Sequence, residues 1–104
     1  MANKVVKFGG SSLADANQFR KVADIIKSDN KRKYVVPSAP GKRFSDDIKV
    51  TDMLYKCCEL AGSGVDFTED FQIIKDRYNG IISDLGVDIS LDADFDIIVN
   101  ELKS

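Results

Sequence analysis

The chain has 104 residues, of which 43% are hydrophobic and 31% charged, and its formal net charge is −2 at pH 7. This composition is ordinary for one soluble globular domain, or for part of a larger one. No apolar stretch is long enough to cross a bilayer, so we expect no membrane partner. The sequence has no histidine and its two cysteines are adjacent, which excludes mixed Cys/His metal sites, His-based catalysis and CxxC redox chemistry.

The first 36 residues predict two strands joined by a helix. Residues 5–8 are a β-rich run that stops at Gly9-Gly10, which is typical of a buried strand followed by a turn. Asp15 starts a capping-box pattern, and apolar residues then recur at helical spacing, so a helix is predicted over about 16–28. A second β-rich run follows at residues 34–36.

A helical connection of this length makes the two strands parallel neighbours with a right-handed crossover. The loops that follow them, residues 8–12 and 37–44, should therefore leave the same edge of the sheet. Open α/β sheets bind their ligands at that edge. This convergence is the main structural prediction from the sequence.

After residue 48 the pattern changes to helices alone. Three apolar stripes at helical spacing predict three helices. Their members are Val50, Met53, Leu54, Cys57 and Ala61; then Phe67, Phe71, Ile74, Tyr78, Ile81 and Leu85; then Leu91, Phe95, Ile98 and Leu102. No third strand is visible, and a sheet of two strands leaves its edges uncovered, so the fold looks incomplete. We therefore divide residues 1–104 into a βαβ ligand-binding core, 1–48, and a helical, flap-like segment, 49–104.

The first loop has features of a phosphate site. Glycines allow the backbone to approach a ligand closely, and the amides of a glycine turn can donate to phosphate oxygens. Lys7 near the end of the strand adds a cation, which would be costly to bury without a ligand. The motif lacks the ending of a Walker A sequence, and two glycines after a strand more often mark an ordinary tight turn than a phosphate site.

The second loop, residues 37–43, offers a hydroxyl at Ser38, small residues, and the cations Lys42 and Arg43. Alone, it is equally well explained as a Pro/Gly turn with solvated charges. Its predicted place beside the first loop favours a binding role. Thr51, at the start of the next helix, either belongs to the apolar stripe or points a hydroxyl at a substrate.

Positive charge is concentrated in the first half of the chain. Residues 1–56 carry twelve Lys or Arg and six Asp or Glu, whereas residues 57–104 carry three and eleven. The cations are scattered and lack an aromatic stacking platform, so we expect no nucleic-acid partner. A small polyanion such as a nucleotide phosphate is a better match, although most of these charges could simply be solvated.

Three segments resemble aspartate kinases, which belong to the amino-acid kinase superfamily. Lys7-Phe8-Gly9-Gly10-Ser11-Ser12 is similar to their KFGGTS signature, with Ser11 in place of the usual threonine. Residues 34–39 resemble their VVxSA segment, and residues 49–54 resemble the threonine-containing helix start that follows it. The segments fall in family order and cover about half of the chain.

The resemblance implies the N-terminal part of a three-layer αβα amino-acid kinase fold, without the regulatory ACT domains. It implies contact with ATP by Lys7, Phe8, Gly9, Gly10 and Ser11, with Lys7 as the catalytic residue. It implies an aspartate subsite at Ser12, Ser38, Ala39 and Thr51. No metal ligand is assigned, and no family role is carried onto Lys42 or Arg43.

The implied reaction is the ATP-dependent phosphorylation of the side-chain carboxylate of L-aspartate, which begins lysine, threonine and methionine synthesis. Mg²⁺ is the expected companion of ATP. We expect a cytoplasmic protein, since the N-terminus lacks a signal-peptide core. We also expect a homo-oligomer as the full-length enzyme, and little activity from these 104 residues alone. Two alternatives remain: another member of the superfamily, or a non-catalytic βα assembly module.

Overall fold

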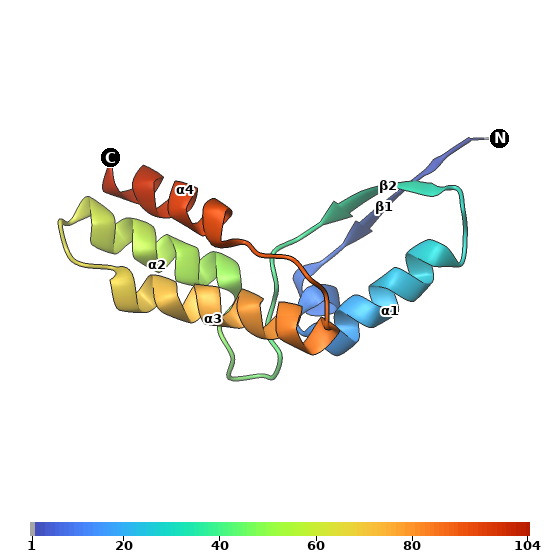
Figure 1. Cartoon of the computed structure of the whole chain (residues 1–104), viewed down its shortest axis with the longest axis horizontal. Coiled ribbons are helices and arrows are strands. Elements are labelled where there is room, and N and C mark those ends of the chain that lie inside the picture. Colours follow the sequence, from blue (N-terminus) through green and yellow to red (C-terminus); the bar gives the residue numbers. More distant parts are fainter. Residues whose placement is uncertain (1) are drawn as a thin grey trace. The chain divides into compact units, whose positions relative to one another are not determined.

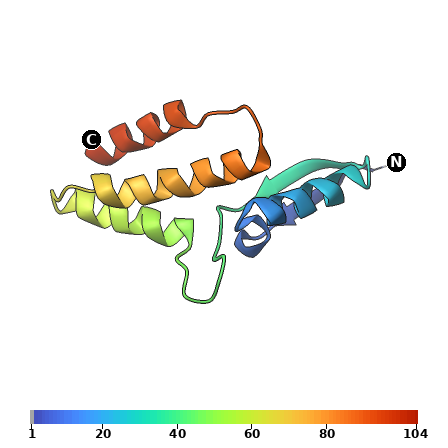
Figure 2. The same ribbon diagram turned by 60° about the horizontal axis from the view of Figure 1, so that its bottom comes forward.

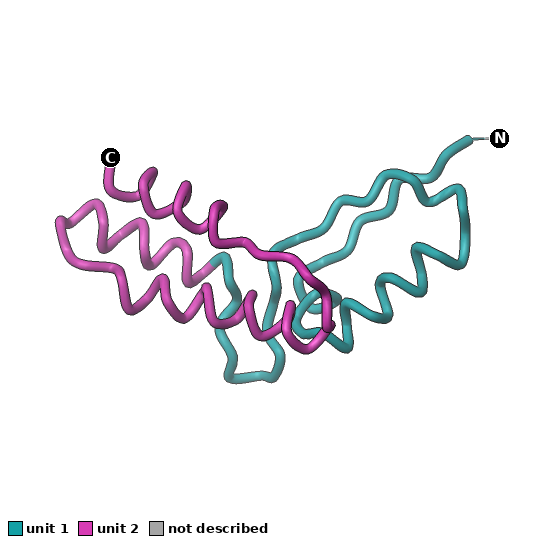
Figure 3. The backbone as a smooth tube through the Cα atoms, viewed as in Figure 1, with its two compact units in different colours: residues 1–51 teal, residues 52–104 magenta. Residues whose placement is uncertain are grey.

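A computed structural model describes residues 2–104 (Figure 1). The elements in chain order are β1 (Lys4–Phe8), the 3-10 turn η1 (Gly10–Leu13), α1 (Ala16–Lys27), β2 (Arg32–Pro37), α2 (Val50–Gly62), α3 (Thr68–Leu85) and α4 (Asp92–Lys103). The chain divides into two compact units, residues 1–51 and 52–104, coloured separately in Figure 3. Within residues 2–104, no helix combines the length and the apolar character needed to span a membrane.

The first unit contains the predicted βαβ arrangement. β1 and β2 are parallel neighbours, with Val6 opposite Val35 and Phe8 opposite Pro37. α1 runs alongside the strands in both views (Figures 1 and 2). It packs on the sheet through a core of Phe8, Leu13 and Val22, with Val6, Phe19 and Ile26 at its margin. The parallel pair, the connecting helix and the helical remainder confirm the predicted fold class.

The other face of the sheet is open in this unit, so the prediction of a fully buried first strand is wrong for the described residues. Val5 is 68% exposed and Tyr34, its register partner, 58%. Side chains alternate between the two faces of a strand, so these residues lie opposite the face that α1 covers. Lys7 follows Val5 by two positions and lies exposed on the same face. Its charge is therefore solvated, without the burial penalty that the sequence suggested.

The first residues of α1 explain where the helix begins. Asp15 has extended backbone geometry, and its Oδ1 accepts a hydrogen bond from the Gln18 amide at 2.9 Å. This bond satisfies one of the amides that a helix leaves unpaired in its first turn. The predicted cap is therefore confirmed, and the helix occupies Ala16–Lys27.

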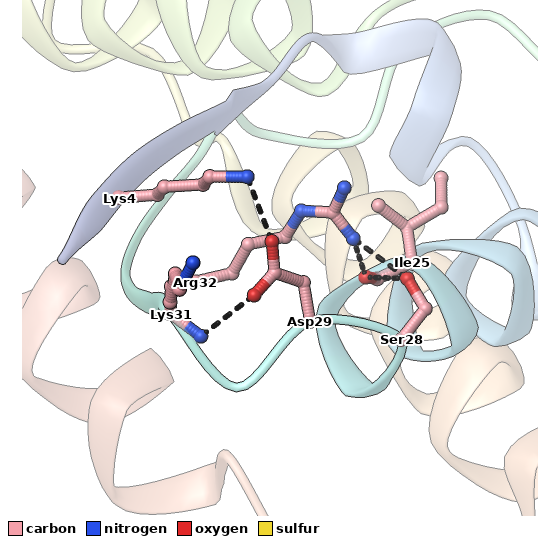
Figure 4. A network of polar contacts seen from close by, with 6 residues as sticks. All are labelled: Lys4, Ile25, Ser28, Asp29, Lys31 and Arg32. Atoms are coloured by element: carbon pink, nitrogen blue, oxygen red, sulfur yellow. Dashed lines mark hydrogen bonds and ion pairs between the residues drawn. The ribbon is translucent and has the colours of Figure 1, made fainter. Parts of the chain in front are cut away.

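A polar network at the far end of the unit fixes the turn between α1 and β2 (Figure 4). Lys4 Nζ lies 2.7 Å from Asp29 Oδ2, and the Lys31 amide donates to Asp29 Oδ1 at 2.9 Å. The Lys4 ammonium and the Lys31 amide lower the pKa of the Asp29 carboxyl. Arg32 donates to Ser28 Oγ at 2.7 Å. These contacts join the amino ends of the two strands, opposite the edge where ligands are expected.

The second unit consists of helices whose apolar stripes face one another. The predicted stripe of α3 supplies Phe71 and Ile74, each 2% exposed. The Phe71 ring meets Phe95 of α4 edge-to-face, with centroids 6.1 Å apart. On the other side of α3, Asp70 Oδ1 lies 3.0 Å from Lys56 Nζ of α2.

Left-handed glycines follow α2 and α3. Gly64 has a φ of 70° and Gly86 a φ of 68°. After α2, the Val65 amide donates to the Leu60 carbonyl at 2.9 Å and the Gly64 amide to the Ala61 carbonyl at 3.1 Å. These two bonds form a Schellman motif, in which the residue at the position of Gly64 has a left-handed backbone conformation that favours glycine. The flap role expected for residues 49–104 stays a prediction.

Candidate functional site

The loops that follow β1 and β2 meet at the carboxyl edge of the sheet. The Ser38 amide donates to the Phe8 carbonyl at 3.0 Å, which extends the pairing of the strands by one residue. The Gly41 amide then donates to the Gly10 carbonyl at 2.8 Å. These two bonds confirm that the loops share one edge, which is the geometry that the sequence predicted.

Two glycines allow this close approach. A Cβ atom added to Gly41 would lie 2.6 Å from the carbonyl carbon of Gly10 and 2.9 Å from the Ser11 amide nitrogen. A Cβ atom added to Gly10 would lie 3.1 Å from the Ala39 carbonyl oxygen. Positive φ is found at Gly64 and Gly86 within the described chain, so the requirement for glycine at positions 10 and 41 comes from space.

A cavity of about 410 Å³ opens between the two loops. Its lining residues are Gly10, Ser11, Ser38, Ala39, Pro40, Gly41, Lys42, Lys49 and Thr51. Among them are two ammonium groups and three hydroxyls, and no carboxylate. A cavity with this lining is suited to an anionic ligand.

Five of the nine predicted site residues line this cavity: Gly10, Ser11, Ser38, Ala39 and Thr51. The other four do not. Phe8 is 9% exposed, and its ring belongs to the core of the first unit. Its carbonyl accepts the hydrogen bond from the Ser38 amide and so helps to hold the two loops together. Lys7 and Gly9 are exposed and Ser12 is half-buried in η1, and none of the three belongs to the lining. The roles assigned to all nine residues stay predictions.

The sequence assigned no individual site role to four lining residues, Pro40, Gly41, Lys42 and Lys49, although it placed the first three in the second loop. Lys49 is the least expected of them, since seven residues separate it from the Gly41 turn. The chain returns because the Val50 amide donates to the Pro40 carbonyl at 3.0 Å, which closes residues 41–49 into a loop.

An ion pair inside this loop was the signal that could have revealed it. Arg43 and Asp47 are four residues apart, and the guanidinium binds the carboxylate through Nε at 2.6 Å and Nη2 at 3.0 Å. The Arg43 amide also donates to Asp47 Oδ2 at 3.0 Å. The guanidinium holds the pKa of the Asp47 carboxyl well below its usual range, and the same contact raises the pKa of Arg43. The Arg43 guanidinium is therefore paired with Asp47 inside the loop, whereas Lys42 and Lys49 have no such partner among the described residues.

Comparisons with known proteins agree with the three motifs. The model of the amino acid kinase family matches residues 3–87. Aspartokinase 3 of Bacillus subtilis (strain 168) is 48% identical over 85 residues, which are 79% of this chain and 18% of that protein. Aspartokinase of Chlamydia trachomatis serovar D is 34% identical over 88 residues, covering 84% of this chain and 18% of that protein.

The crystal structure of Clostridium acetobutylicum aspartate kinase is similar over nearly the whole chain. Its TM-score is 0.94 at 45% sequence identity, and the match covers 99% of this chain and 24% of that one. The chain thus spans about a fifth to a quarter of the length of these relatives. These matches confirm the resemblance that the motifs predict.

Proposed function

The chain belongs to the amino acid kinase family, and we propose that the protein carrying it is an aspartate kinase, which transfers the γ-phosphoryl group of ATP to the side-chain carboxylate of L-aspartate. The observation that carries this proposal is the anion-suited cavity at the carboxyl edge of the sheet, lined by a glycine turn, hydroxyls and lysines. Support comes from the two aspartokinases and the aspartate kinase structure to which the chain is similar.

In the proposed reaction an oxygen of the side-chain carboxylate attacks the γ-phosphorus. A bond forms between that oxygen and phosphorus, the bond from phosphorus to the β,γ-bridging oxygen breaks, and ADP leaves with the electron pair. The products are 4-phospho-L-aspartate and ADP. A carboxylate is already ionised near neutral pH, so the reaction needs no general base and the lack of histidine is no obstacle. Catalysis then depends on aligning two anions and offsetting their charge.

The first loop is the proposed phosphate subsite. The backbone of Gly9, Gly10 and Ser11 can approach phosphate oxygens closely, because two of these residues have no side chain. Lys7 lies exposed on the preceding strand, where its long side chain can bring an ammonium to the same oxygens. The second loop and the start of α2, through Ser38, Ala39 and Thr51, are the proposed aspartate subsite, with Ser12 at the border.

The described residues do not provide a Mg²⁺ site. The cavity lining has no carboxylate, and residues 2–104 contain no group of three or more His, Cys, Asp or Glu placed to hold a metal. Mg²⁺ prefers carboxylate, phosphate and water oxygens. No step of the proposed mechanism is therefore assigned to a metal held by these residues.

Hydroxylamine trapping tests the proposal directly, because acyl phosphates react with hydroxylamine to give hydroxamates, which form a coloured complex with ferric iron. The protein at its full encoded length, supplied with ATP and MgCl₂, should form the hydroxamate with L-aspartate and not with L-glutamate or N-acetyl-L-glutamate. Hydroxamate formation with one of the other acids would assign the protein to another member of the family.

A pair of lysine variants separates catalysis from general charge effects. Lys7→Ala should lower kcat by at least about a hundredfold, the effect of removing a cation that stabilises the transferring group by a few kcal/mol. Lys33→Ala, which removes an exposed lysine at the opposite end of the sheet, should leave the rate unchanged. Equal activity in both variants would contradict the proposed role of the first loop.

A further inference from the structure

The positive charge that lines the cavity comes from Lys42 and Lys49. Lys7 is not part of the lining. Ion pairs within residues 2–104 engage other basic residues, among them Lys4, Arg43 and Lys56. Neither cavity lysine has a carboxylate partner among the described residues. Neither motif reasoning nor the family resemblance assigns a role to these two residues.

Loop closure brings the two lysines together although six residues separate them. Lys42 directly follows Gly41, which is bonded to Gly10, and Lys49 directly precedes Val50, which is bonded to the Pro40 carbonyl at 3.0 Å. Both lysines thus flank the closed neck of the loop. The Arg43–Asp47 pair folds the residues between them onto themselves, and Asp47 retains only 7% of its side-chain exposure.

Two ammonium groups at one cavity favour an anion between them. Like charges that share a site repel each other, and a bound anion offsets this repulsion while gaining attraction from both. The lining provides no carboxylate to neutralise them. The positive charge of the cavity therefore favours a ligand with a negatively charged group.

We propose that Lys42 and Lys49 bind the carboxylate of the amino-acid acceptor that does not react; this inference rests on the aspartate kinase function proposed above. Both lysines belong to the stretch between Ala39 and Thr51, which line the proposed acceptor subsite, whereas the proposed triphosphate subsite follows β1. Pairing with an ammonium makes a carboxylate a weaker nucleophile, since it stabilises the negative charge that attacks. The lysines therefore suit the α-carboxylate, and the side-chain carboxylate stays free to react.

The test compares L-aspartate with its α-amide, L-isoasparagine, which keeps the side-chain carboxylate and lacks the α-carboxylate. In the protein at its full encoded length, Lys42→Gln and Lys49→Gln should each raise KM for aspartate about tenfold, the effect of losing a charge-assisted hydrogen bond. The KM for L-isoasparagine should change little in either variant. The preference of the wild-type protein for aspartate over the α-amide should shrink accordingly. Lys33→Gln is the matched control, since that lysine is exposed and does not line the cavity.

Each outcome decides between named alternatives. Unchanged KM values for aspartate in both variants of an active enzyme would overturn the lysine assignment. A rise in KM for ATP instead would also overturn it and would place the lysines at the triphosphate. An inactive wild-type protein would refute the aspartate kinase proposal itself. Both lysines are exposed, so their substitution should leave the fold intact, which far-UV circular dichroism checks. Calorimetric titration with aspartate then measures binding without turnover.

Discussion

The close contact between the two loops predicts that Gly41→Ala is strongly destabilising. The added methyl would lie 2.6 Å from the Gly10 carbonyl carbon, whereas ordinary van der Waals contact begins at 3.4 Å. The loops must therefore separate by about 0.8 Å, and the neighbouring atoms belong to the backbone, which cannot rotate away. Overpacking of this kind costs about 1–3 kcal/mol.

The same displacement weakens the hydrogen bond from the Gly41 amide to the Gly10 carbonyl, now 2.8 Å long. Its loss adds about 1 kcal/mol, so we expect Gly41→Ala to lower the free energy of unfolding of residues 2–51 by about 2–4 kcal/mol. Gly10→Ala meets its nearest neighbour at 3.1 Å and should cost about 1 kcal/mol, the low end of the same range. Gly9→Ala meets nothing within 4 Å and should stay within about 0.5 kcal/mol of wild type.

Urea denaturation monitored by backbone amide NMR signals measures this series, because it reports on the first unit separately from the helices of the second. Protection of the Ser38 and Gly41 amides from hydrogen exchange should fall in the same order. If Gly41→Ala proves as stable as Gly9→Ala, with both amides still protected, the loops are not held together as described. The cavity geometry would then have no support.

Three further predictions concern single side chains. Asp15→Ala removes the cap of α1 and should cost about 1 kcal/mol by urea denaturation, whereas Asp15→Ser should retain most of the stability. Cys58 is exposed and should react with iodoacetamide in the folded protein, whereas Cys57, fully buried and with its thiol pKa raised by burial, should be alkylated only in urea, as counted by mass spectrometry. Asp47→Asn should lower the urea midpoint at about pH 7, and the difference from wild type should narrow below about pH 4, since the lowered pKa of Asp47 stabilises the fold only while the unfolded carboxyl is ionised. A difference that grew on acidification would mean that Arg43 does not lower that pKa.

Local patterns predicted the helices and their buried faces well. The stripe that begins at Phe67 places Phe71, Ile74 and Ile81 inside, because a period of 3.6 residues allows only one face to be apolar. The capping residue Asp15 and the left-handed Gly86 mark helix ends through bonds to residues at most four positions away. Signals of this kind can be predicted from the sequence because every residue that takes part lies within a few positions of the others.

The environment of Lys7 could not be predicted in the same way. The alternation of the strand determines that Lys7 and Val5 share a face, but not whether another layer covers that face. Within the first unit α1 covers the opposite face, and Lys7 is exposed. Burial of a strand depends on elements distant in sequence, which is why the buried-strand prediction was wrong.

The cavity lining shows the same division between local and distant signals. The βαβ topology requires the two loops to meet, so Gly10, Ser38 and Ala39 follow from the sequence. Lys49 enters the lining only because a hydrogen bond to the Pro40 carbonyl closes the second loop. Such a closure depends on geometry between residues ten positions apart, which no periodic pattern records.

This closure holds the cavity-lining residues of the second loop in place whatever the length of the segment between them. The residues that line the cavity lie at the two ends of the loop, and the Gly41 and Val50 amides hold those ends in place through backbone bonds. The Arg43–Asp47 pair lies between the ends and folds the middle residues onto themselves. Because loop-closure entropy grows only slowly with length, residues added to the loop outside the Arg43–Asp47 pair would add little to the entropic cost of closure. The middle of the loop can therefore vary without displacing either lysine, whereas substitution of Gly41 acts directly on the site.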